Sequence, residues 1–115
     1  MEVRLFKRED AVMTHTGGPP GEAGICRLIT EEISKTLGAG LASFDECSVE
    51  WTVTYDEVVV VLEGEFRLRL GDRVIVARPG DVMWIPANTS FRYEGTKAVI
   101  CYAVYPVDWR TRKQT

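Results

Sequence analysis

Histidine and cysteine are scarce in this sequence, and acidic residues outnumber basic ones. The 115 residues include one histidine and three cysteines, and the formal net charge is −3. A structural zinc site needs about four clustered thiolate or imidazole ligands, whereas these residues are scattered and form no Cys-x-x-Cys pair. The odd cysteine count argues against a disulfide framework, and the negative charge provides no basic face for nucleic acid. We expect reduced thiols and no nucleic-acid partner.

Long hydrophobic runs are absent too. No apolar stretch approaches the roughly 20 residues that a membrane-spanning helix requires. The N-terminal sequence Met-Glu-Val-Arg-Leu-Phe lacks the apolar region of a secretory signal. Hydrophobic residues make up 45% of the chain and charged residues 27%, which is typical of a folded domain rather than a disordered chain. We expect one cytoplasmic domain over residues 1–115 and no membrane partner.

Turn signals divide most of the chain into short strands. Residues 66–70 alternate phenylalanine or leucine with arginine, as a half-buried strand does. Gly71 and Asp72 then form a predicted two-residue hairpin of type II′, and the apolar run 58–62 suits a strand covered on both faces. We expect nine or ten strands with almost no helix. Such a chain closes into a jelly roll or small barrel, because open sheet edges would aggregate.

Glycine and proline mark the expected connections. Segment 14–24 contains four glycines and two prolines, which predicts a flexible loop. Before it, residues 2–6 alternate polar and apolar side chains and predict a short edge strand. Residues 31–37 carry the only helical pattern; a turn and a single helical turn both remain open, because the segment is too short to be a stable helix alone. Glycines predict further turns at 63–65 and 94–96.

The strongest candidate for chemistry is a glutamate at the start of the most apolar strand. There Glu57 either stays at the surface or points into the mouth of the barrel, since an unpaired buried carboxylate is costly. Burial would raise its pKa and suit it to acid–base catalysis. Period-2 alternation places Trp51, Val53 and Tyr55 on the same strand face, and Tyr102 of the last strand offers a hydroxyl group. These side chains either line a pocket or fill an apolar core.

The spacing around this glutamate resembles the cupin motifs. Six residues separate Glu57 from Gly64, as in the second half of the first cupin motif, and five separate Gly80 from Pro86, as at the start of the second. The predicted hairpin fits between the two. Residues 39–105 therefore resemble a cupin core, which implies an all-β fold of the double-stranded β-helix, or jelly-roll, type with little helix.

The resemblance does not extend to the metal ligands. Metal-binding cupins place two histidines shortly before the glutamate, and here those positions are Trp51 and Val53 or, in the other register, Glu50 and Thr52. The later histidine position is Phe91, which we expect to fill the space of the missing imidazole. Without imidazoles, a first-row transition metal loses its usual cupin ligands. We expect no cofactor; a divalent cation held by carboxylate and phenol oxygens is the alternative.

A narrower resemblance is to the cupin domain of the EutQ family, the ethanolamine-utilisation cupins. The similarity lies in residues 51–57, 61–65 and 105–109 and extends from Gly38 to Trp109. That family also lacks the histidines. The resemblance implies a link to ethanolamine catabolism in bacterial microcompartments, with acetate kinase activity for some members.

Together these patterns predict a small polar metabolite bound inside the barrel of a homodimer. The alternatives are an acetate-kinase-like phosphoryl transferase, an isomerase or lyase, and an oxygen-ligated divalent-metal site, so enzymatic activity stays an open question. The predicted catalytic residues are Glu57 and Tyr55, and the predicted ligand-binding residues are Trp51, Val53, Phe91 and Tyr102.

Overall fold

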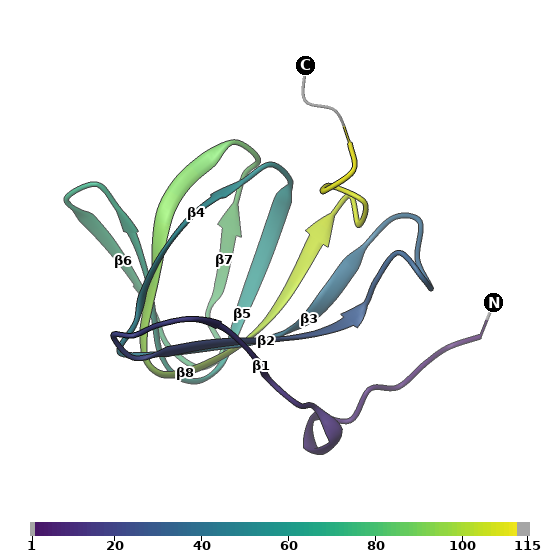
Figure 1. Cartoon of the computed structure of the whole chain (residues 1–115), viewed down its shortest axis with the longest axis horizontal. Coiled ribbons are helices and arrows are strands. Elements are labelled where there is room, and N and C mark those ends of the chain that lie inside the picture. The colour runs from purple at the N-terminus through teal and green to yellow at the C-terminus, as the bar shows by residue number, and fades with distance from the viewer. Residues whose placement is uncertain (1, 113–115) are drawn as a thin grey trace.

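Eight antiparallel strands account for most of the molecule (Figure 1). The computed structural model describes residues 2–112, and its one helix is the short 3-10 helix η1 (Arg8–Asp10). The strands are β1 (Thr14–Gly17), β2 (Glu22–Ile29), β3 (Gly38–Asp45), β4 (Ser48–Val53), β5 (Asp56–Leu70), β6 (Arg73–Ala77), β7 (Val82–Ile85) and β8 (Thr89–Tyr105).

The two longest strands, β5 and β8, join the two layers of the barrel. The main path of the sheet is β1-β2-β3-β8-β5-β6, while β4 pairs with β8 and β7 pairs with β5. The first part of β8 pairs with β4 and its last part with β3. In the same way, β5 pairs first with β7 and then with β6. Each long strand thus contributes to both layers, which gives the predicted jelly roll.

Two predicted turns are wrong, because each lies inside one of these long strands. Residues 63–65 belong to β5 and residues 94–96 to β8. The pairing register shifts on both sides of Glu63, and Gly64 adopts a φ of 70° against the Lys97 backbone. Glycine therefore allows a bulge at which the strand bends without ending. This is why eight strands replace the expected nine or ten.

The N-terminal region also differs from expectation. No strand forms over residues 2–6, and most of the predicted loop 14–24 is a hairpin of β1 and β2, in which His15 pairs with Gly24. Only residues 18–21 lie outside these strands, because the glycines and prolines cluster in the connection itself. The flexibility of this segment stays a prediction. Residues 31–37 form turns rather than a helix.

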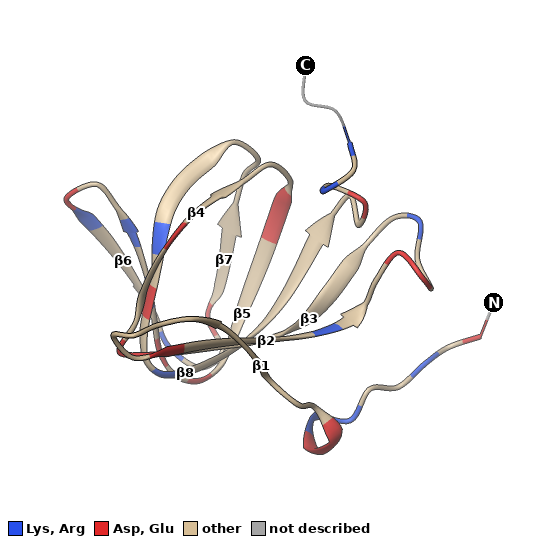
Figure 2. Cartoon of the chain, viewed as in Figure 1, with Lys and Arg blue, Asp and Glu red and all other residues tan. Residues whose placement is uncertain are grey.

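The hairpin between β5 and β6 agrees with the sequence. Leu70 pairs with Arg73 across the two-residue turn, and Gly71 has a φ of 64° whereas Asp72 does not have a positive φ. This is the pattern of a type II′ turn. Figure 2 shows acidic and basic segments around β6 and its neighbours, where Arg69 forms an ion pair with Glu94 at 3.1 Å.

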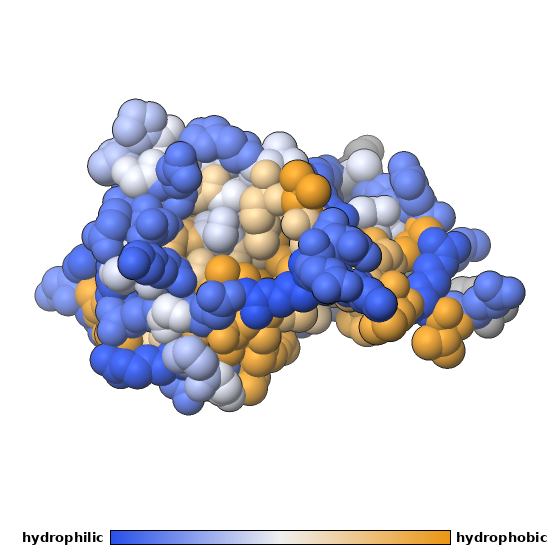
Figure 3. Space-filling model, turned by 90° about the horizontal axis from the view of Figure 1, so that it is seen from below, coloured by the Kyte–Doolittle hydropathy of each residue, from blue (hydrophilic) through white to orange (hydrophobic). Residues whose placement is uncertain are grey.

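Apolar side chains fill the space between the layers, and others remain outside. The most deeply buried are Val53, Val59, Val61, Phe66, Ile85 and Ile100. On the outward face of β7 and β5, however, Val82, Trp84 and Val58 are exposed. Figure 3 shows hydrophobic residues along the lower edge of the molecule in that view and around the N-terminal segment at the right. Among the described residues, no helix is long and apolar enough to cross a membrane.

Candidate ligand-binding site

A cavity of about 590 Å³ lies inside the barrel. Its inner wall comes from β2, β3, β4, β5 and β8, and its rim includes residues 29–32 and the segment that follows β8. A backbone hydrogen bond of 2.8 Å from Val107 to the Thr36 carbonyl fastens that last segment to the β2–β3 connection. The polar and aromatic residues of the wall include Trp51, Tyr55, Glu57, Tyr93, Tyr102 and Trp109.

Glu57 is the buried charged group of this cavity. Its residue is 4% exposed, and the Tyr93 hydroxyl donates a hydrogen bond of 2.9 Å to Oε1. Burial raises the pKa of Glu57 to about 7, and the Tyr93 hydrogen bond partly opposes that rise. Its other oxygen, Oε2, accepts no hydrogen bond from the described residues. Every fully buried polar side-chain atom of these residues has a hydrogen-bond partner. Because Oε2 has none, it is not fully buried, and it faces accessible space in the cavity.

Three aromatic side chains form a group beside this carboxylate. The Trp51 indole donates a hydrogen bond of 2.9 Å to the Tyr55 hydroxyl. The Tyr55 ring lies 4.5 Å from the Trp109 ring, centroid to centroid, and the Trp51 ring meets Trp109 edge-on at 6.2 Å. Burial raises the pKa of Tyr55 to about 12, so its hydroxyl stays protonated near neutral pH. The group therefore presents aromatic faces and a phenol to the cavity.

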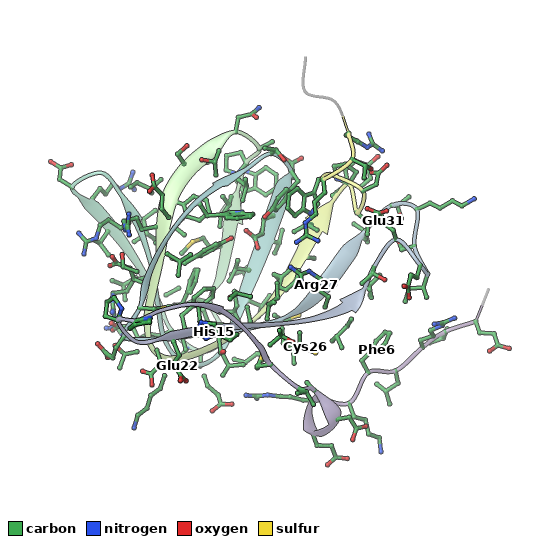
Figure 4. All side chains as sticks on the ribbon, in the orientation of Figure 1. Phe6, His15, Glu22, Cys26, Arg27 and Glu31 are labelled. Atoms are coloured by element: carbon green, nitrogen blue, oxygen red, sulfur yellow. The ribbon has the colours of Figure 1, made fainter. Side chains whose placement is uncertain are left out.

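Charged residues stand at the rim. Arg27 of β2 and Arg110 of the C-terminal segment line the cavity together with Glu31 and Glu32. Figure 4 shows Arg27 and Glu31 on the same side of the barrel, while the exposed His15 lies farther along the β1–β2 hairpin. The Arg110 guanidinium lies over the Trp109 ring at 4.7 Å from its centroid. The rim thus combines both signs of charge.

The structure brings four of the predicted site residues together and leaves two apart. Glu57, Tyr55, Trp51 and Tyr102 line one cavity. Val53, by contrast, ends β4 and is fully buried in the core. Phe91 is 4% exposed and packs against Tyr93 at 4.7 Å between ring centroids, so it supports the wall from behind. Val53 and Phe91 therefore pack in the core and do not line this cavity.

Sequence reasoning missed two residues that the cavity needs. Tyr93 follows Phe91 by two positions on the same strand face, so strand alternation carried a signal for it. Arg27 alternates with Ile25 and Ile29 in β2, and all three line the cavity. A cationic residue on an otherwise apolar strand face was the signal there. Trp109, which follows β8, packs against Tyr55.

The residues of this site do not fit the metal that cupin folds commonly hold. No imidazole lines the cavity, and no group of three or more His, Cys, Asp or Glu side chains could hold a metal ion within residues 2–112. Asp56 and Glu50, the two carboxylates that most closely precede Glu57 in the sequence, do not line this cavity either. Asp56 is exposed and accepts a hydrogen bond of 3.0 Å from the Ala87 backbone, and Glu50 faces Arg92 at 3.7 Å outside the barrel.

Comparison with known proteins identifies the family. The family model described as "Ethanolamine utilisation protein EutQ" matches residues 1–111. The chain belongs to the EutQ family. A protein from Salmonella typhimurium named "Acetate kinase EutQ" is 33% identical over 96 residues, which cover 83% of this chain and 42% of that protein. The chain thus spans about two fifths of that relative's length.

Solved structures agree on the fold of this EutQ-family chain. The structure of the Clostridium difficile EutQ protein has a TM-score of 0.76 at 29% identity, covering 85% of this chain and 72% of that one. A cupin-like protein from Thermotoga maritima has a TM-score of 0.69 at 15% identity over 93% of this chain and 84% of that one, a likeness in fold alone. The predicted cupin fold and EutQ resemblance are therefore confirmed.

Proposed function

We propose that this EutQ-family cupin binds a small polar metabolite inside its barrel without a histidine-ligated metal. The observation that carries the proposal is Glu57, whose Oε2 faces a cavity of about 590 Å³. That volume suits a small molecule, and an apolar wall with a few fixed polar groups is the usual composition of such a site. Tyr93 holds the carboxylate in place, while Tyr55 and Tyr102 add hydroxyl groups.

A metabolite screen by thermal shift, followed by calorimetry, tests this function. Glu57→Gln keeps the shape of the side chain but removes its charge, and we expect it to weaken the best ligand at least about tenfold, as loss of a charged hydrogen-bond partner does. Glu50→Gln is the matched control, because Glu50 is exposed outside the cavity. If Glu57→Gln binds every ligand from the screen with unchanged affinity, the Glu57 cavity is not the binding site.

A second candidate function is acid–base or phosphoryl-transfer catalysis in this cavity. Glu57 has a pKa of about 7 and can therefore exchange a proton near neutral pH, with Tyr55 as the protonated partner. The name of the Salmonella typhimurium relative supports acetate as a substrate to test, although the chain covers 42% of that protein. Incubating the purified chain with ATP and acetate and measuring acetyl phosphate tests phosphoryl transfer. No turnover in this assay would remove the phosphoryl-transfer candidate.

We also infer that the chain pairs with a second copy in the cytoplasm. The three cysteines are free, which suits a reducing compartment. The outward face of β7, β5 and the end of β8 exposes Val82, Trp84, Val58 and Tyr105, the first two at 67% and 60%. An exposed apolar face of this kind can be buried against the same face of a second copy across a two-fold axis.

A further inference from the structure

The cavity surrounds one buried carboxylate with aromatic rings. Trp51, Tyr55, Tyr93, Tyr102 and Trp109 all line the space that Glu57 faces. An aromatic ring carries negative potential on its face, so several rings around a cavity favour a cation. A buried carboxylate is costly unless an opposite charge pairs with it, and no Lys, Arg or His within residues 2–112 forms an ion pair with Glu57.

The net charge of the cavity lining also favours a cation. Two arginines and three glutamates line the cavity, so its lining carries a net charge of −1 when Glu57 is ionised. Arg27 and Arg110 stand at the rim with Glu31 and Glu32, which leaves Glu57 as the inner charge. The guanidinium of Arg110 over Trp109 demonstrates that an indole face of this group already accepts a cation.

We propose that the ligand is a small organic ammonium ion, whose charged nitrogen lies between Glu57 and the aromatic rings. This inference rests on the proposed function and names the ligand's chemical class. An ammonium group donates hydrogen bonds to Oε2 of Glu57, which accepts none from the described residues, while Tyr93 continues to hold Oε1. The alkyl part packs against the apolar wall, which includes Ala42, Phe44 and Ile100. The ligand thus supplies the positive charge that Glu57 lacks.

Binding of an ammonium ion also displaces a proton. In the free protein, burial holds the pKa of Glu57 near 7, and a bound cation lowers it because it stabilises the ionised form. The groups around Glu57 are the hydroxyls of Tyr55, Tyr93 and Tyr102, the apolar strand partners Ile85 and Val104, and Arg27 and Arg110 at the rim. Burial raises the pKa of each of the three tyrosines above its ordinary value of 10, whereas that of Glu57 is about 7, so affinity should rise about tenfold from pH 6 to pH 8.

Three probes that share one tert-butyl group test the proposal: tert-butylammonium, tert-butanol and pivalate. They differ in charge and little in shape, and the ammonium probe stays charged across this pH range. Calorimetry on the purified chain should give binding of tert-butylammonium, with tert-butanol and pivalate at least about tenfold weaker. At pH 7, two buffers of different ionisation enthalpy should report proton release on binding. Tighter binding of pivalate or tert-butanol, or no binding of any probe, overturns the ammonium proposal.

Two variants locate the bound cation. Glu57→Gln should weaken tert-butylammonium at least about tenfold and abolish proton release. Trp109→Leu should also weaken it, whereas Trp84→Leu, which removes an exposed indole from the outer face, should not. Equal weakening by both tryptophan changes, or none by Glu57→Gln, contradicts the assigned position. If pivalate binds and tert-butylammonium does not, the cavity is still a ligand site and the proposed function stands; the metabolite screen with Glu57→Gln decides that function separately.

Discussion

At the scale of single residues, Glu57 should make the protein less stable as pH rises. Its pKa of about 7 in the folded state exceeds its ordinary value of 4.5, so the folded state holds this proton more tightly than the unfolded state does. The free energy of unfolding therefore falls as pH rises from about 4.5 to about 7, and levels off above that. The predicted loss is about 2 to 3 kcal/mol.

Urea unfolding at pH 5 and pH 8 measures this loss. Glu57→Gln cannot ionise, so its free energy of unfolding should fall about 2 to 3 kcal/mol less than that of the wild type over the same range. Other carboxylates titrate alike in both proteins and cancel in the difference. The same pH dependence in both proteins would contradict a buried Glu57 with a raised pKa.

Tyr93, on the neighbouring strand, limits the rise that burial causes in the pKa of Glu57. Its hydrogen bond to Oε1 stabilises the ionised carboxylate, so Tyr93→Phe should raise the pKa of Glu57 further and move the pH transition upward. Carbon-13 NMR of the glutamate side chains follows that titration directly. Tyr105→Phe is the control, since Tyr105 is 49% exposed on the outer face. If the pKa of Glu57 is the same in Tyr93→Phe as in the wild type, this hydrogen bond does not influence that pKa.

At the scale of elements, the bulge in β5 depends on one glycine. Gly64 has a φ of 70°, and a Cβ there would collide with the backbone of Thr96 and Lys97 in β8. Gly71 has a similar φ of 64° in the hairpin turn, but a Cβ there meets nothing within 4 Å. Gly71→Ala should cost about 1 kcal/mol of stability, from backbone strain alone. Gly64→Ala should cost several kcal/mol, since it adds a collision with backbone. Denaturant unfolding measures both losses of stability. Equal losses for the two variants would contradict a role of the β8 backbone in requiring glycine at position 64.

The sequence predicted part of this arrangement of strands, bulge and cavity. Alternation placed Trp51, Tyr55 and Glu57 on one strand face; in the structure they line one cavity, but from β4, the β4–β5 turn and β5 respectively. Glycine at position 64 could signal a turn or a bulge, because both need a positive φ; only pairing with β8 distinguishes them. The position of Trp109 follows from a backbone hydrogen bond between Val107 and Thr36, a contact between distant segments that no local pattern encodes.

At the scale of the whole molecule, charge and apolar surface are unevenly distributed. The sheet around β6 carries ion pairs of arginine with glutamate, whereas the outer face of β7 and β5 presents Val82, Trp84 and Val58. Monomeric proteins rarely expose a contiguous apolar sheet face with a tryptophan at its centre. The aromatic Trp84 is also the type of residue that contributes most to protein interfaces. This uneven surface favours association through the β7–β5 face.

The proposed homodimer should therefore depend on Trp84. A charge placed on this face would be desolvated against its own symmetry copy, so Trp84→Lys should shift the equilibrium from dimer to monomer. Sedimentation equilibrium at several protein concentrations measures the dissociation constant, which we expect to rise at least about a hundredfold. Val76→Lys is the matched control, because Val76 is 42% exposed on β6, away from this face. A wild-type chain that sediments as a monomer, or a Trp84→Lys dimer of unchanged affinity, would exclude this face as the interface.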